Sequence, residues 1–143
     1  MANPGAATTT TVHPQTLSSN QAIRLIAYAT GVSIAATGDA AITLPVINTT
    51  SYNITNVIIT DANKDVSAGA LAIWTGAGGT GTEIVTNAAL TSNTSSAFVT
   101  KSTVVAATGT ANLSAQKFYV RVGTAVADGT VDVFVYGTDF TAF

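Results

Sequence analysis

The sequence predicts an all-β protein: a single antiparallel β-sandwich of jelly-roll or immunoglobulin-like type. Val, Ile and Thr are plentiful, whereas the helix formers Glu, Lys, Arg and Leu are scarce, and β-branched side chains fit a pleated sheet better than a helix. Short apolar runs alternate with clusters of turn residues along the chain, a pattern typical of sandwiches. A chain of 143 residues is long enough for one domain with its own core.

The chain predicts nine strands, each a run rich in β-branched or aromatic residues between clusters of turn residues. In chain order the strands are residues 23–28, 32–36, 41–47, 52–60, 70–75, 83–86, 97–106, 117–124 and 130–137. The clusters between them are rich in Gly, Asp, Asn, Ser and Thr, and they include residues 37–39, 48–51, 61–65, 76–81, 108–109 and 128–129.

The last two strands carry the clearest alternation. In each strand, valines or a phenylalanine alternate with residues that would lie on the opposite face, and Asp128-Gly129 stands between the strands. This pattern predicts an antiparallel hairpin. Tyr119, Phe134 and Tyr136 fall on its second face, so we expect that face to be partly covered and these three residues to contribute to an interface.

The first 21 residues predict an extended N-terminal arm, followed by the sandwich domain over residues 22–143. Pro4, Gly5, a run of threonines and Pro14 give the arm no periodicity and little to bury. A disordered tail and an arm ordered against a neighbour are both open. Residues 1–12 have neither a basic nor an apolar region, so we expect no secretory signal there.

A shortage of charge is the main guide to function. Only 8% of residues are charged and the mean hydropathy is +0.42, where soluble domains carry about 25% charged residues. For this mass the folded surface is roughly 6,800 Å², or about 570 Å² per charge. A free monomer with such a surface would tend to associate non-specifically, so we expect other subunits to cover much of it. The five basic residues are scattered, which argues against direct nucleic-acid binding.

Catalytic and cofactor-binding residues are not expected. The single His, His13, lies on the arm, and Glu83 is the only Glu, so neither a nucleophilic triad nor an acid–base pair is predicted. Residues 76–81 fit the spacing G-x-G-x-x-G, but a strand-like segment follows where a dinucleotide site needs a helix. We interpret them as a hairpin loop. We expect Trp74, the only Trp, to lie in the core or at an interface.

Residues 61–65 have the D-x-N-x-D spacing of a calcium loop. The sixth position of that loop should be Gly and the twelfth Glu, but they are Val66 and Ala72, and Lys64 adds a positive charge. A plain turn is therefore the main interpretation, bound calcium stays open as the alternative, and no metal site is expected. The chain has no Cys, so disulfides and thiolate metal sites are excluded.

Several segments between residues 32 and 137 follow one another in a familiar order: 35–39, 52–62, 68–75, the Gly-rich loop, 118–122 and 131–137. In this order they resemble the small proteins of tailed bacteriophages that decorate or cement the capsid. The resemblance implies a β-sandwich, commonly trimeric, that sits on the assembled shell of major capsid protein and ties neighbouring capsomers together. It implies no catalytic residues.

The expected function is therefore a virion structural protein on the capsid surface, a decoration or cement protein that acts as a homo-oligomer, with a trimer favoured. Three alternatives are open. The first is another virion part, such as a head-fibre base, a tail subunit or a small coat protein. The second is an extracellular adhesin or pilin-like module that pairs by strand addition. The third is a carbohydrate-binding or hydrolytic domain. No membrane partner and no cofactor are expected.

Overall fold

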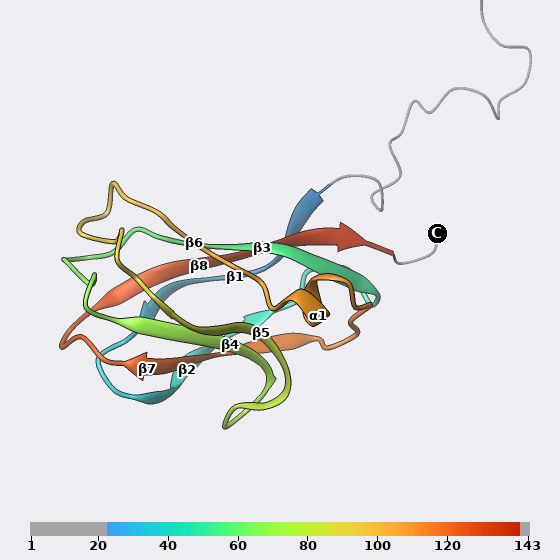
Figure 1. The fold of residues 1–143 in the computed structure, drawn as a ribbon, viewed down its shortest axis with the longest axis horizontal. Helices are drawn as coiled ribbons and strands as arrows, with labels where there is room; N and C mark the ends of the chain where they lie inside the picture. The colour runs from blue at the N-terminus through green and yellow to red at the C-terminus, as the bar shows by residue number, and fades with distance from the viewer. Residues whose placement is uncertain (1–22, 141–143) are drawn as a thin grey trace, which may run out of the picture.

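The structure, a computed structural model, describes residues 23–140 and confirms the all-β class (Figure 1). The arm expected over residues 1–21, with His13, lies outside the described residues. Within them the chain forms eight strands and one short helix. In chain order these are β1 Ile23–Ser33, β2 Gly38–Pro45, β3 Tyr52–Thr60, β4 Ala70–Gly76, β5 Thr80–Ala89, β6 Thr100–Ser102, α1 Ala106–Gly109, β7 Lys117–Thr124 and β8 Thr130–Asp139.

The strands form two four-stranded antiparallel sheets packed face to face. Sheet A has the order β1-β8-β3-β6 and sheet B the order β2-β7-β4-β5. Strand β1 pairs with β8, β2 with β7, β3 with β6 and β4 with β5, as in one long hairpin wrapped around a barrel axis. This eight-stranded order is the jelly roll, so the jelly-roll alternative of the predicted sandwich is the observed one.

The core lies between the two sheets, and on strands such as β7 and β8 alternate residues point inward. On β7 the inward residues Phe118, Val120 and Val122 are at most 2% exposed, and β8 contributes valines in the same way. Phe118 meets Tyr52 of β3 edge to face, with ring centroids 6.0 Å apart, and the Tyr52 hydroxyl donates a hydrogen bond to the Ala115 carbonyl. The buried Tyr52 hydroxyl, the only polar atom on these two rings, therefore has a hydrogen-bond partner.

The predicted hairpin of the last two strands is wrong. Strand β7 pairs with β2 and β4 in sheet B, whereas β8 pairs with β1 and β3 in sheet A. The turn at Asp128-Gly129 exists, and Asp128 has a positive φ of 56°, which turn residues often adopt, but the turn leads the chain from one sheet to the other. Period-two alternation reports only which side of a strand faces the core, and both strands face the same core from opposite sides.

Several strand boundaries also differ from the predicted ones. Strands β3 and β7 have the predicted bounds. The predicted strands 23–28 and 32–36 are largely one strand, because a bulge with Gly31 at φ 63° lets β1 continue. The predicted strand 97–106 is reduced to β6, and the short helix α1 follows it. Strand β5 is longer than predicted and begins at Thr80, inside the predicted 76–81 loop. It pairs with β4, so the segment is a hairpin as interpreted, with a loop of residues 77–79.

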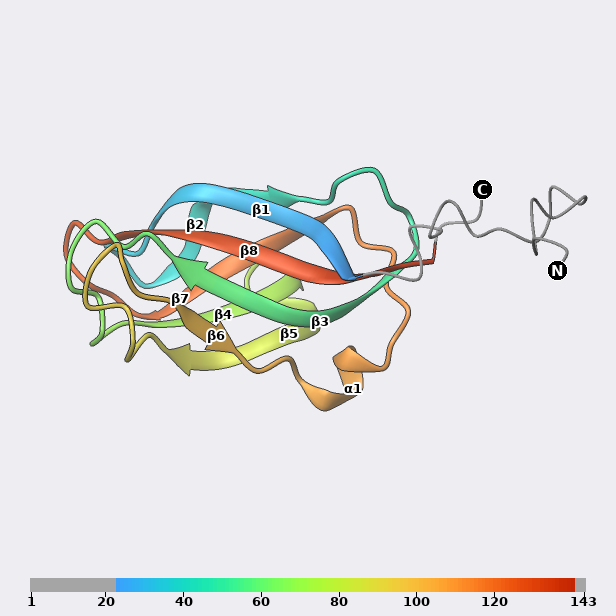
Figure 2. The same ribbon diagram turned by 90° about the horizontal axis from the view of Figure 1, so that it is seen from above.

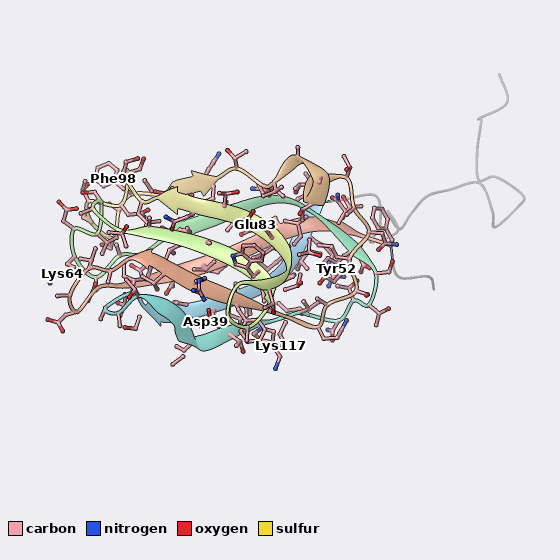
Figure 3. The ribbon with its side chains drawn as sticks, turned by 60° about the horizontal axis from the view of Figure 1, so that its bottom comes forward. Asp39, Tyr52, Lys64, Glu83, Phe98 and Lys117 are labelled. Carbon is pink, nitrogen blue, oxygen red and sulfur yellow. The ribbon has the colours of Figure 1, made fainter. Side chains whose placement is uncertain are left out.

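The described chain enters and leaves the sandwich at the same end. Ile23, where β1 begins, is the register partner of Thr138 near the end of β8. Figures 1 and 2 show these two ends of the ribbon side by side, with α1 at the same end of the molecule. The loops that contain Lys64 and Phe98 lie at the opposite end (Figure 3).

Candidate functional site

The three predicted interface residues lie on two opposite surfaces of the sandwich. Phe134 and Tyr136 point outward from β8 in sheet A, and Tyr119 points outward from β7 in sheet B. All three side chains are half-buried. Because β7 and β8 are not paired, the single aromatic surface expected for them is corrected to two separate surfaces.

The outer surface of sheet A carries a contiguous apolar patch. Register pairing places Tyr28 of β1 and Ile58 of β3 on either side of Phe134, and Leu25 of β1 beside Tyr136, and directly paired residues project to the same side of a sheet. The Tyr28 and Phe134 rings are stacked, with centroids 6.1 Å apart and planes 8° apart. Tyr28 is 44% exposed. We call Leu25, Tyr28, Ile58, Phe134 and Tyr136 the aromatic face.

Charged groups lie around the aromatic face, and none of them is a register partner of Phe134 at its centre. Lys101 of β6 pairs with Ile58 at the side of the face, and Arg24 lies at one end on the inward side, where it pairs with Gly137. At one end Asp132 accepts a hydrogen bond of 2.7 Å from the Gly31 N–H and so holds the β1 bulge. At the other end Arg24 donates to Asp139 at 2.8 Å and to the Ile47 carbonyl at 2.7 Å. Asp139 is 2% exposed and also accepts a hydrogen bond of 2.6 Å from Thr49. These polar contacts hold the two ends of the strands, Lys101 borders the face beside Ile58, and the row of Tyr28, Phe134 and Ile58 is apolar.

The outer surface of sheet B is more polar. Lys117 lies over the Tyr119 ring, with Nζ 5.5 Å from its centroid, a cation–π contact. Arg121 makes an exposed ion pair of 3.3 Å with Asp39 of β2. Figure 3 looks onto this surface, with Asp39 on β2 and Glu83 on β5. This surface therefore presents both signs of charge beside its aromatic side chains.

The turn over residues 61–65 directs its polar side chains at a neighbouring turn. Asn63 accepts a hydrogen bond of 2.9 Å from the Thr130 N–H and donates one of 2.8 Å to the Asp128 carbonyl. Lys64 donates to the Ala127 carbonyl at 3.1 Å. Hydrogen bonds from the side chain and backbone of Ser67 lower the pKa of Asp65. These contacts favour the plain turn, because two of the three candidate calcium ligands are occupied by protein groups.

Over residues 23–140 the structure brings together no group of three or more His, Cys, Asp or Glu side chains that could hold a metal ion. The same range contains no helix long and apolar enough to cross a membrane. The functional argument therefore depends on the two outer surfaces of the sandwich. Comparison of the chain with protein-family models, curated proteins and solved structures gives no match.

Proposed function

We propose that the chain is a virion structural protein that binds the assembled shell of major capsid protein in a tailed bacteriophage and stabilises it. It is a capsid decoration or cement protein on the capsid surface, acts as a homo-oligomer with a trimer favoured, and catalyses no reaction. The observation that carries the proposal is the aromatic face of sheet A, which has no charge at its centre, on a chain in which only 8% of residues are charged.

The aromatic face has the composition of a protein-binding surface. Tyr and Phe are enriched where proteins meet, and charged residues are depleted from the centre of such contacts and kept at the rim. Asp132 of β8 and Lys101 of β6 hold the rim positions here. The stacked rings of Tyr28 and Phe134 restrict each other's rotamers before any partner arrives, which lowers the conformational entropy lost on docking.

The jelly roll is compatible with this role, because capsid proteins of many viruses use it. It is also used by lectins and other proteins, so the fold alone assigns no function. The surface carries the argument instead. A protein repeated many times on a shell needs a contact surface that tolerates changes of ionic strength, and apolar contacts are less sensitive to salt than charged ones.

Stabilisation of the shell would follow from mass action. A protein that binds the assembled lattice better than the dissociated subunits stabilises the lattice by RT ln(1 + [L]/Kd) per site, about 2.7 kcal/mol when its free concentration is 100 times Kd. No chemistry is needed for this effect. The number of occupied sites and the affinity of each one set its size.

The test compares particles that lack the protein with complete particles. Depleted particles should release their genome at a lower temperature and under milder osmotic shock, and adding the purified protein should restore resistance. The variant Phe134→Asp places a charge at the centre of the aromatic face and should fail to restore it. The matched control Thr43→Asp places the same charge on sheet B, beside Tyr119, and should restore it fully.

Two results would count against the proposal. Depleted particles as robust as complete ones would exclude the cementing role. Light scattering that found a soluble monomer at micromolar concentration would remove the homo-oligomer from the proposal. Because Phe134→Asp could act through misfolding, its thermal unfolding must be shown to match that of Thr43→Asp before the particle data are interpreted.

A further inference from the structure

A pocket of about 220 Å³ lies on the outer surface of sheet B, on the opposite side of the sandwich from the aromatic face. Three neighbouring strands line it: β4 with Ala72 and Trp74, β5 with Glu83 and Asn87, and β7 with Arg121 and Gly123. Register pairing places Glu83 directly beside Trp74 and Arg121 beside Ala72. An indole, a carboxylate, an amide and a guanidinium therefore surround one hollow.

The floor of the pocket depends on small residues. Ala72 is 6% exposed, and Gly123 presents no side chain at all. A Cβ at Gly123 would overlap the amide of Asn87, whose atoms lie directly over the Gly123 backbone. The missing side chain thus creates the space in which Asn87 lies across β7 and faces the pocket.

The position of Arg121 is held from outside the pocket. Asp39 accepts a hydrogen bond from Arg121 at 3.3 Å and another from the Gly78 N–H at 2.5 Å. This second bond ties the β4–β5 loop to β2. Gly79 of that loop has φ 75° and lies close enough to Arg121 that an added Cβ would be 3.5 Å from its Cδ. The positive φ favours Gly at this position. The loop therefore passes beside the Arg121 side chain with no side chain of its own in between.

Three of the polar groups in the pocket have unused hydrogen-bonding capacity. Within residues 23–140, the side chains of Trp74, Glu83 and Asn87 make no hydrogen bond to other protein groups. Trp74 and Glu83 are half-buried. A partly buried carboxylate beside a free indole N–H and a free amide is a convergent set of polar groups of the kind that orients a small ligand.

We propose that this pocket binds one neutral sugar ring of a glycan. The hydroxyl groups of a sugar both donate and accept, so they match the acceptor Glu83, the donor Arg121 and the amide of Asn87, which does both. The apolar C–H face of a sugar ring matches the flat face of the Trp74 indole. Glu83 disfavours an anionic ligand and Arg121 a cationic one, which leaves an uncharged polar ligand as the best fit.

The inference goes beyond capsid attachment and is independent of it. The pocket and the aromatic face lie on opposite surfaces of the sandwich, so a molecule docked through sheet A keeps the pocket open to solvent. On a particle surface, many copies of a weak site would act together, because multivalent attachment multiplies modest single-site affinities. A role in attachment to surface glycans would therefore be added to the structural role.

The test uses Trp74 as its own reporter, since it is the only Trp of the chain. The full-length protein is titrated with methyl glycosides of glucose, galactose, mannose and N-acetylglucosamine, and a glycan array is screened in parallel. We expect one of these sugars to change the Trp74 emission in a saturable way, with Kd in the millimolar range that is common for a single small polar ligand.

Four variants, compared by calorimetric titration with the same sugar, test the assignment. Glu83→Gln and Asn87→Ala should weaken binding at least 10-fold by removing a polar partner. Gly123→Ala should weaken it as much without removing any polar group, because its methyl group displaces Asn87. Lys117→Ala, on the same surface but outside the lining of the pocket, is the matched control and should bind as the unchanged protein does. Thermal unfolding checks that each variant folds.

The proposal fails if no sugar changes the emission and the array stays blank. It also fails if binding survives both Glu83→Gln and Gly123→Ala, which would place the sugar elsewhere, or if only a charged ligand or a peptide binds. These results leave the particle-stability test untouched. Conversely, particles that need no cement would not affect the titration.

Discussion

The two outer surfaces of the sandwich differ in chemistry although both sheets pack their inner sides against the same core. On sheet A the central positions are aromatic or aliphatic, and the two stacked rings of Tyr28 and Phe134 lie in the middle. On sheet B the corresponding positions carry Glu83 and Arg121 as well as Trp74. One surface is a broad apolar patch, and the other is a small hollow with polar walls.

This difference separates what the core requires from what the surface is free to do. Both sheets contribute the same kind of inward residue, mostly valine, isoleucine and leucine, because the inward side must fill one shared core. The outward side has no such constraint. The differences on that side are the basis of the two partners proposed above: a protein surface for sheet A and a small polar ligand for sheet B.

The largest expected difference between the two surfaces is in attachment to capsids after an aromatic ring is removed from one surface or the other. Phe134→Ala and Tyr136→Ala should each weaken attachment to capsids by about 2 kcal/mol, or about 30-fold, as expected for anchors at the centre of an interface. Tyr119→Ala, on sheet B, should leave attachment within about 2-fold of the unchanged protein. Co-sedimentation with depleted particles measures all three.

Folding must be controlled in this series, because Phe134 stacks on Tyr28. Phe134→Leu keeps an apolar side chain and should recover part of the attachment if hydrophobic contact is the main contribution. Equal losses for Tyr119→Ala and Phe134→Ala would show that the two surfaces do not differ in function as inferred here.

Two ion pairs within the described range 23–140 extend the comparison to stability. Asp139 is buried with Arg24 and Thr49, so Asp139→Asn should lower the free energy of unfolding by about 2 kcal/mol. This is less than the loss for a fully buried pair, since the Arg24 side chain is 28% exposed and can reach water. Arg121→Gln breaks an exposed pair and should cost about 0.5 kcal/mol or less. Urea unfolding measures both.

A difference in the reverse order would be informative. Asp39 accepts hydrogen bonds from both Arg121 and the Gly78 N–H of the β4–β5 loop. If Arg121→Gln were the more destabilising variant, Arg121 would be needed to keep Asp39 in place for its bond to the loop.

Tyr52, which is buried in the core between the two sheets, should have a smaller effect on stability. Burial raises the pKa of its hydroxyl above the ordinary value, near 10 for unfolded chains. The unfolded state therefore releases this proton first, so the contribution of neutral Tyr52 to stability is complete below about pH 10 and declines as the pH rises further. Tyr52→Phe should be about 1 kcal/mol less stable at pH 7, through loss of the hydrogen bond to Ala115.

The same variant should also lose less stability than the unchanged protein between pH 9 and pH 11. Unfolding in urea at several pH values in this range tests the difference. The other tyrosines are common to both proteins, so their contributions cancel in the comparison. Parallel loss of stability in the two proteins would rule out Tyr52 as the responsible group.

The sequence was sufficient to predict the fold class and the inward faces of β7 and β8. Strands β3 and β7 have the predicted bounds because turn residues flank their apolar runs on both sides. The bulge at Gly31 was missed, since its stability comes from Asp132, a residue 101 positions away along the chain. The helix α1 was missed for a similar reason: Thr108 bonds to the carbonyl of Glu83 on another strand.

The surfaces could be predicted only in part. Alternation placed Tyr119, Phe134 and Tyr136 on outward positions, but it carries no information about which strands are neighbours. Tyr28 and Ile58 join the aromatic face only through the register of β1 and β3 with β8. The pocket was missed altogether, because its residues come from three strands and its floor depends on a side chain that Gly123 lacks.

The neighbouring positions of the two described chain ends have a mechanical consequence. Ile23 and Thr138 are partners at one end of the antiparallel β1·β8 pair, so a force that pulls these ends apart acts on the first hydrogen bonds of the ladder before the next ones. The strands then peel apart pair by pair, and no more than a few bonds resist at once. A pull applied across a sheet surface meets many side-chain contacts together. An attachment that must withstand tension is therefore stronger when it is made through a surface of the sandwich than through the ends of the chain.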